Sequence, residues 1–174
     1  MQSVSSANFS LSIAYVIPGF VTLLGLRWHS DVVQSWLGQQ TSDSPTVGGF
    51  LYVTLASIGV GLFVNGLRWL TVDQIHMRTG SPKKDWSYAD LQKHYLAYEF
   101  LINNQFRYHQ FNGNMLISVA FYWASGCVAF GWPGTWSLLG LLGIESVFLL
   151  ISRNTYDNYI RRSRQLFGNS SPAA

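Results

Sequence analysis

The longest uncharged run of this chain lies between Gln110 and Ile144 and reads "QFNGNMLISVAFYWASGCVAFGWPGTWSLLGLLGI". A window of about 18 uncharged, mostly apolar residues is long enough to cross a lipid bilayer as a helix. The run is roughly twice that length, and it contains the turn signal Trp132-Pro133-Gly134. It therefore predicts two membrane-spanning helices joined by a tight turn, at about 111–131 and 135–152.

Two earlier segments, Phe9–Leu26 and Gly48–Leu67, pass the same length test and predict spans at about 9–27 and 48–70. Only 11% of the 174 residues are charged, whereas a soluble domain has about 25% charged residues. A soluble four-helix protein would also carry charges at helical spacing along its outer faces, and these segments do not. We therefore expect one all-α integral membrane domain over 1–174, with four transmembrane helices in an antiparallel bundle.

Basic residues are concentrated in two parts of the sequence. Ten of the eleven lie at the inner edge of span two, in the 71–110 segment or after span four. Lys and Arg near span ends stay in the cytoplasm, so we expect 71–110 and the tail 153–174 to be cytoplasmic, with both termini inside a cell inner membrane. The net charge of +3 then reflects a face against anionic lipid and does not require nucleic acid.

Five basic residues are expected at the inner membrane interface: Arg68, Arg153, Arg161, Arg162 and Arg164. Arg68 is close in sequence to Asp73, and Arg153 is four residues before Asp157. We expect both pairs to form at the surface. We also expect the first span to be retained rather than cleaved as a leader, because no basic residue precedes it.

The 71–110 segment predicts a long helix. Ser87 and Asp90 form a capping pattern, and no Pro or Gly interrupts the chain from Tyr88 until Gly113. Apolar and aromatic residues, together with one histidine, recur at helical spacing at Leu91, Tyr95, Tyr98, Ile102, Phe106 and His109. We expect an amphipathic cytoplasmic helix that leads into the third span and bends at Gly113.

The polar residues of this helix form one candidate site: Glu99, Asn103, Asn104, Arg107 and His109. Glu99, Asn103 and Arg107 share one helix face, because they are spaced by four residues. Three uses remain open for these side chains. They could satisfy the helix at the membrane interface, line a vestibule or partner surface, or bind a polar ligand in an enzyme.

Glu145 is near the middle of the fourth predicted span. An ionised carboxylate is costly there, so such a group faces protein or water rather than lipid. Pro18, Ser57 and Tyr122 fall at nearly the same depth, and Pro18 leaves the Ala14 carbonyl without its helical donor. We expect an intramembrane polar cluster of these residues, with Tyr122 or Ser57 donating to Glu145, that acts either as packing glue or as a proton or ion site.

Small residues at near-helical spacing predict where helices approach closely. The pairs are Ser57 with Gly61, Ala120 with Ala124, and Gly140 with Gly143.

Motifs for phosphate binding, thiol chemistry, zinc proteases and serine nucleophiles are missing from the sequence. No two of the four His residues have the i, i+4 spacing of a helical metal pair. We therefore expect no catalytic residue, no metal and no cofactor.

These patterns favour a non-enzymatic, multi-pass inner-membrane protein that contacts the lipid bilayer and self-associates. Its role would be that of a channel-like component or membrane-perturbing effector. Two alternatives remain open. One is a membrane anchor or adaptor that recruits a cytoplasmic protein, for example in a bacterial defence or signalling complex. The other is a small integral-membrane enzyme acting on an amphiphilic substrate.

Overall fold

The computed structural model describes residues 6–37, 47–81, 86 and 88–168. The secondary structure in this part of the chain is helical throughout. Its elements are α1 (Ser6–Leu26), α2 (Asp31–Trp36), α3 (Val47–Leu70), α4 (Val72–Arg78), α5 (Tyr88–Lys93), α6 (Tyr95–Leu101), the π-helical turn η1 (Ile102–Phe106), α7 (Arg107–Phe130) and α8 (Thr135–Gly168).

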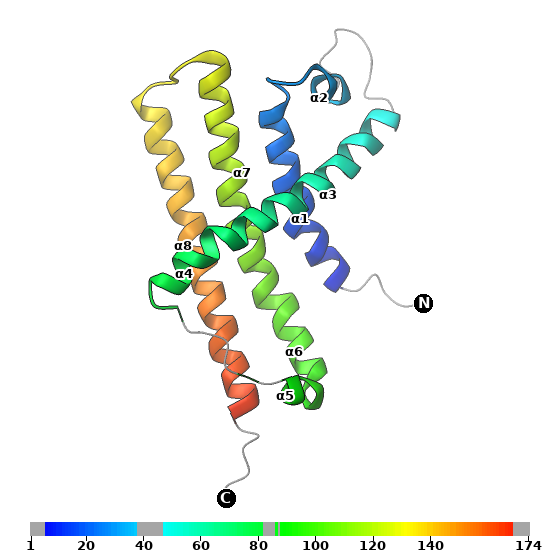
Figure 1. Ribbon diagram of the computed structural model, residues 1–174, viewed down its shortest axis with the longest axis vertical. Helices are drawn as coiled ribbons and strands as arrows, with labels where there is room; N and C mark the ends of the chain where they lie inside the picture. Colours follow the sequence, from blue (N-terminus) through cyan, green and yellow to red (C-terminus); the bar gives the residue numbers. More distant parts are fainter. Residues whose placement is uncertain (1–5, 38–46, 82–85, 87, 169–174) are drawn as a thin grey trace, which may run out of the picture.

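The helices α7 and α8 form the predicted hairpin and run antiparallel, side by side (Figure 1). Between them, Gly131 and Gly134 have φ angles of 84° and 92°, a left-handed conformation that glycine adopts without a Cβ penalty. The helix α8 continues unbroken from Thr135 to Gly168. Residues 153–168, expected as part of a separate tail, therefore extend the fourth helix.

Three helical stretches are long and apolar enough to cross a membrane: Val47–Arg78, Tyr95–Phe130 and Thr135–Phe167. The apolar stretch of α1, Ile13–Leu26, is shorter. By length and composition, the described part of the chain therefore contains three of the four predicted spans. This is compatible with a membrane protein.

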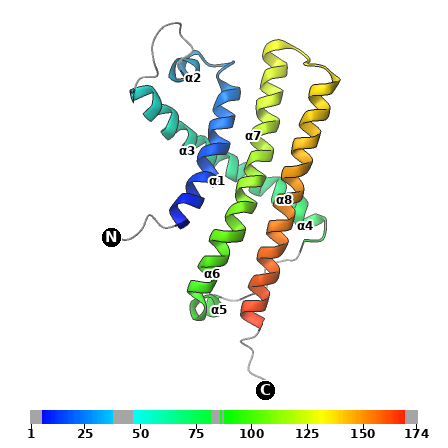
Figure 2. The ribbon, with the colours of Figure 1, turned by 180° about the vertical axis from the view of Figure 1, so that it is seen from behind.

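The helix α3 departs from a simple antiparallel bundle. Figure 1 and Figure 2 show that it crosses α1 and α7 obliquely, while α1, α7 and α8 lie roughly side by side. A Cβ at Gly61 would overlap the Tyr15 carbonyl oxygen, and a Cβ at Gly19 would overlap the Ser57 carbonyl oxygen. The backbones of α1 and α3 thus touch at the crossing, as the Ser57 and Gly61 spacing predicted.

The other glycine pair does not mark a helix contact within the described chain. A Cβ at Gly140 or Gly143 would meet nothing within 4 Å. The prediction of close packing at this pair was therefore wrong for the single chain, and these glycines face outward from α8.

The amides at the start of α7 lie inside the protein rather than along its surface. Gln110, Asn112 and Asn114 are at most 6% exposed. The helix α7 passes through Gly113 without interruption, and the irregular turn is η1, several residues earlier. The missing side chain at Gly113 makes room for the Arg68 side chain of α3.

A buried ionic cluster where four helices meet

The candidate functional site is a group of buried charged and polar side chains at the point where α3 turns into α4. Arg68 is in the last turn of α3 and Asp73 is in the first turn of α4. Their side chains form an ion pair with 2.6 Å between Nη1 and Oδ1. Arg68 is only 3% exposed, so the predicted pair forms, but in the interior and not at the surface.

His109 of α7 joins this ion pair and is fully buried. Its Nε2 lies 2.8 Å from Arg68 Nη1 and 3.1 Å from Asp73 Oδ1. Its Nδ1 lies 3.0 Å from the Ser152 carbonyl oxygen and 2.9 Å from Ser152 Oγ. The imidazole therefore connects the α3–α4 corner to α8.

The two neutral forms of His109 use different partners. Because arginine only donates hydrogen bonds, the contact with Arg68 requires an unprotonated Nε2, and Nδ1–H then donates to the Ser152 carbonyl. In the other form, Nε2–H donates to Asp73, and Nδ1 accepts from the Ser152 hydroxyl. Both neutral forms of His109 therefore find hydrogen-bond partners in the same arrangement of side chains.

A second imidazole completes the cluster. His76 of α4 is 1% exposed, and its Nε2 lies 3.3 Å from Ser152 Oγ. The ring of Tyr156 packs against both imidazoles, tilted against His109 at 4.9 Å between centroids and stacked on His76 at 6.3 Å. We call Arg68, Asp73, His76, His109 and Ser152 the ionic cluster.

Gly113 explains how the Arg68 side chain reaches this position. A Cβ at Gly113 would lie 2.7 Å from Arg68 Cδ and 3.0 Å from Arg68 Cγ. Glycine therefore leaves the groove through which the arginine passes across α7.

The ionic cluster contains an Asp–His–Ser chain of hydrogen bonds, which is the arrangement of a hydrolase relay. Ser152, however, has no exposed surface. A substrate could reach its Oγ only if α7 and α8 separated. Among the described residues, no group of three or more His, Cys, Asp or Glu side chains is placed to hold a metal ion. The geometry fits an internal linkage between helices better than a catalytic centre.

A polar ladder links α1 to α7 on the other side of the bundle. Arg107 Nη1 donates to Gln110 Oε1 at 2.8 Å and to the Tyr15 hydroxyl at 3.4 Å. Further along, Asn114 Nδ2 donates to the Ala14 carbonyl at 2.9 Å. That carbonyl is the one that Pro18 leaves without a helical donor, so a buried amide on α7 replaces the missing backbone hydrogen bond.

The predicted face of Glu99, Asn103 and Arg107 is not held together in the described chain. Arg107 bonds to Tyr15 and Gln110, and among these described residues no hydrogen bond joins it to Glu99 or Asn103. The turn η1 lies between these positions, and its wider winding shifts the helical phase. Asn104 is exposed, and its side chain donates to the Phe100 carbonyl.

In the described part of the chain, no hydrogen bond joins Glu145 to Ser57 or Tyr122 of the predicted intramembrane cluster. Pro18 is buried at the α1–α3 crossing, and Ser57 donates to the Val53 carbonyl of its own helix. The Tyr122 ring packs against Trp28, with 5.0 Å between centroids. Both carboxylate oxygens of Glu145 are buried without a hydrogen-bond partner in the described part of the chain.

The level of Glu145 follows from the hairpin. Trp123 Nε1 donates to Ser137 Oγ at 3.0 Å, which fixes the register of α7 and α8. Glu145 is eight residues further along α8, and Met115 is eight residues back along α7. Glu145 therefore lies at the level of Met115, in an apolar part of the hairpin.

One basic residue of α8, Arg153, differs from expectation. Arg153 Nη2 donates to the Thr79 carbonyl at 3.0 Å, and no ion pair with Asp157 forms between these described residues. Arg161 is exposed and donates to Asn158, while Arg162 and Arg164 are exposed.

His76, Asn114 and Ser152 take part in these networks, but they were not predicted as site residues from the sequence. For Asn114 a signal existed, because Pro18 had released a carbonyl that needed a donor. Ser152 carried no signal of its own, since its partners His76 and His109 are distant in sequence.

The fold and the ionic cluster define a helical protein whose long apolar helices are fastened internally by buried polar groups. Comparisons with known protein families, with curated proteins and with solved structures found no match to this chain.

The Asn114 bond can be tested by a double-mutant cycle. Asn114→Ala should lower the free energy of unfolding by about 1–2 kcal/mol, because the buried Ala14 carbonyl loses its donor. In a Pro18→Ala background the backbone N–H of residue 18 serves that carbonyl, so the same substitution should cost about 1 kcal/mol less. Reversible unfolding in mixed micelles measures all four proteins, and strictly additive effects would contradict the assignment.

Proposed function

We propose that the chain is a non-enzymatic, multi-pass inner-membrane anchor that presents a helical stalk to a cytoplasmic protein. The stalk consists of Trp86, α5, α6, η1 and residues 153–168 of α8. The basic residues of these two segments support a cytoplasmic placement of the stalk, because Lys and Arg near span ends stay in the cytoplasm.

Helix length supports a stalk outside the bilayer. About 20 helical residues cross a hydrocarbon core about 30 Å thick. The stretch Tyr95–Phe130 has 36 residues and α8 has 34. Each helix therefore extends roughly 15 residues, or about 20 Å, past the core. In α8 the first basic residue is Arg153, which suits the inner interface.

The stalk has an aromatic core of its own, and this observation carries the proposal. The hydroxyls of Tyr98 and Tyr159 lie 2.6 Å apart. Trp86 packs against Phe167 at 5.5 Å between centroids, and Phe106 packs against Tyr159 at 5.1 Å. A segment that only lay on the lipid surface would have no need for such internal packing.

A groove of about 420 Å³ lies on the stalk between α6 and the end of α8. Its wall includes Phe100, Leu101 and Arg162. Phe100 is 65% exposed, and the neighbouring Leu96 is 79% exposed. Large apolar side chains exposed to water mark interaction sites, and the arginine at the groove favours an acidic partner. The groove suits an amphipathic helix with apolar anchors flanked by Asp or Glu.

Site-specific photo-crosslinking in cells tests this proposal. A photo-reactive amino acid at position 100 should trap one discrete protein, whereas the same probe at the exposed position 104 should not. Arg162→Glu should reduce the trapped product roughly tenfold, which corresponds to about 1.4 kcal/mol of binding free energy. Equal trapping at both positions, or insensitivity to Arg162→Glu, would refute the docking role.

The channel-like alternative rests on a separate observation, the unpartnered carboxyl of Glu145 in the described chain. An acid that finds no donor within one chain could bind a proton or an ion in an oligomer. In proteoliposomes the channel would conduct, and Glu145→Gln would change its conductance. Ser146→Ala is the matched control, because the Ser146 hydroxyl donates to the Leu142 carbonyl of its own helix. A wild-type protein that does not raise liposome permeability would exclude this alternative.

A further inference from the structure

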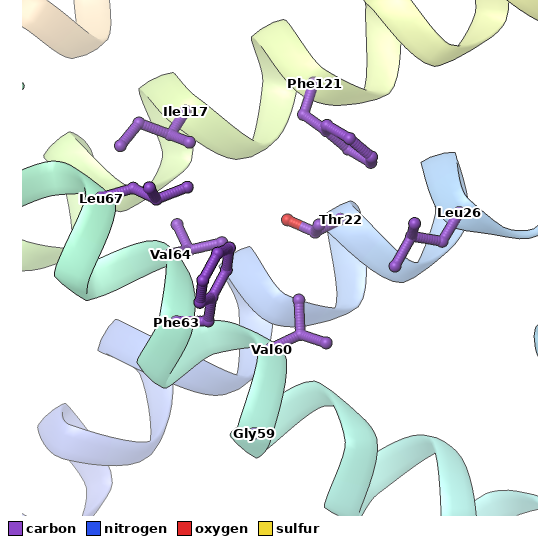
Figure 3. Close-up of a pocket in the computed structure, with 9 residues that line it drawn as sticks. All are labelled: Thr22, Leu26, Gly59, Val60, Phe63, Val64, Leu67, Ile117 and Phe121. Atoms are coloured by element: carbon purple, nitrogen blue, oxygen red, sulfur yellow. The ribbon is translucent and has the colours of Figure 1, made fainter.

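A second cavity, of about 370 Å³, lies between α1, α3 and α7 (Figure 3). In Figure 3 side chains from all three helices converge on it, among them Leu26 from α1, Phe63 and Leu67 from α3, and Phe121 from α7. Thr22 is the one polar residue among the described residues that line it.

Three helix contacts frame this cavity. The α1–α3 crossing lies at Gly61, where the backbones touch. The helices α1 and α7 meet where Thr22 Oγ1 lies 3.1 Å from Ser118 Oγ. The helices α3 and α7 meet where Arg68 passes Gly113. Because α3 crosses obliquely, the three helices diverge between these contacts and leave a wedge-shaped space.

Water is a poor occupant for this space. A buried water needs two to four polar partners. The single proton of the Thr22 hydroxyl already has two acceptors in reach, the Pro18 carbonyl at 3.0 Å and Ser118 Oγ at 3.1 Å, so Thr22 has no proton left to donate to a water. The other described side chains of the lining are hydrocarbon.

We propose that this cavity holds one acyl chain of a bilayer phospholipid. The lining residues of α3 and α7 lie in the middle of two helices that are long enough to span a membrane. Lipid chains surround such helices as their solvent, and a void would forfeit dispersion contacts along its walls. A cavity of about 150 Å³ is enough for benzene, so this one accommodates a longer hydrocarbon segment. The proposal requires membrane embedding, but it is independent of the stalk partner.

A bound acyl chain explains how α3 can cross α1 and α7 obliquely without losing apolar contacts. The acyl chain would fill the space between α3 and the two helices α1 and α7, and would pack against all three. Recognition is by shape and by apolar contact, so it should depend on the acyl chain and not on the headgroup.

Two glycines of α3 provide a matched pair for a test. A Cβ at Gly59 or at Gly66 would meet nothing within 4 Å, so both positions accept a side chain. Of the two, only Gly59 lines the cavity. Gly59→Leu adds an isobutyl group at a residue that lines the acyl-chain site, whereas Gly66→Leu makes the same chemical change at a residue of α3 outside the lining.

The experiment uses the full-length protein, purified in detergent and exchanged into micelles that contain palmitoyl-oleoyl phosphatidylglycerol or the matching phosphatidylcholine. Native mass spectrometry should show one retained phospholipid per chain for the wild type and for Gly66→Leu, with either headgroup. Gly59→Leu should reduce that occupancy roughly tenfold. Added lipid should raise the melting temperature of the wild type but not that of Gly59→Leu.

Either of two results would overturn the proposal. One is equal lipid retention by the two leucine variants, and the other is no lipid retained by the wild type. Retention of lipid with only one of the two headgroups would also contradict the proposal, because it would show that the headgroup and not the acyl chain is recognised. The melting measurement confirms that each variant is folded, so loss of lipid cannot be mistaken for loss of structure.

Discussion

Gly61→Val should separate α1 from α3 and cause one of the largest losses of stability of any single substitution proposed for this protein. The added side chain would begin at a position already occupied by the Tyr15 carbonyl oxygen, which is a backbone atom. A flexible side chain could move aside, but a carbonyl within a helix cannot. We expect the free energy of unfolding to fall by about 3 kcal/mol or more, beyond the usual 1–3 kcal/mol for overpacking.

The same helix supplies the control. Gly66→Val adds the same side chain where nothing lies within 4 Å, so it should change stability by less than about 1 kcal/mol. Gly19→Val disrupts the same crossing from the α1 side, and in combination with Gly61→Val its effect should not add. Unfolding of each variant in mixed micelles provides the comparison. Similar losses for Gly61→Val and Gly66→Val would show that the backbones do not touch at this point.

Asp73→Ala should cause a loss of stability of similar size. It leaves the Arg68 guanidinium buried without its counter-ion, which typically costs about 3–5 kcal/mol. His109 cannot replace the carboxylate, because its imidazole supplies no negative charge. The control is Asp31→Ala, which removes an exposed carboxylate and should cost about 1 kcal/mol or less.

The ionic cluster makes a further prediction about the pair as a whole. Replacing both members, with Arg68→Met and Asp73→Leu, should recover much of the stability lost in Asp73→Ala, because no buried charge then remains unpaired. If the double variant were less stable than Asp73→Ala alone, the cost would not come from an uncompensated charge.

Much of the architecture follows from the sequence. The Trp132-Pro133-Gly134 signal located the hairpin, because a long uncharged run must turn where proline and glycine interrupt it. The Ser57 and Gly61 spacing located the α1–α3 contact, because small residues let backbones approach. These are local properties, and they can be read from neighbouring residues.

The sequence did not predict the angle at which α3 crosses α1 and α7. It also did not predict how the face of α6 is rotated relative to the face of α7. The angle depends on which carbonyl each glycine meets on another helix, and the sequence does not specify that partner. The phase depends on one π-helical turn at Ile102–Phe106, and this turn has no signature in residue type. A single shift there was enough to separate Arg107 from Glu99.

The ionic cluster, too, could be predicted from the sequence only in part. Arg68 and Asp73 are close in sequence and were predicted to pair, but His109 and Ser152 join them only through tertiary packing. The same packing turned the amides of α7 inward. Gln110 and Asn114 donate to α1, and Asn112 donates to the Tyr108 carbonyl of its own helix. The amides at the front of this apolar helix therefore serve buried or partly buried acceptors.

Cysteine accessibility tests the central claim most directly, namely that the stalk extends from a membrane-spanning bundle into the cytoplasm. In a Cys127→Ser background, single cysteines replace the exposed Thr135 at the hairpin turn and the exposed Gln165 of the stalk. A membrane-impermeant maleimide applied to intact spheroplasts should label position 135 and leave position 165 unlabelled until the membrane is permeabilised. Labelling of position 165 in intact spheroplasts would contradict the proposed topology and the docking role that depends on it.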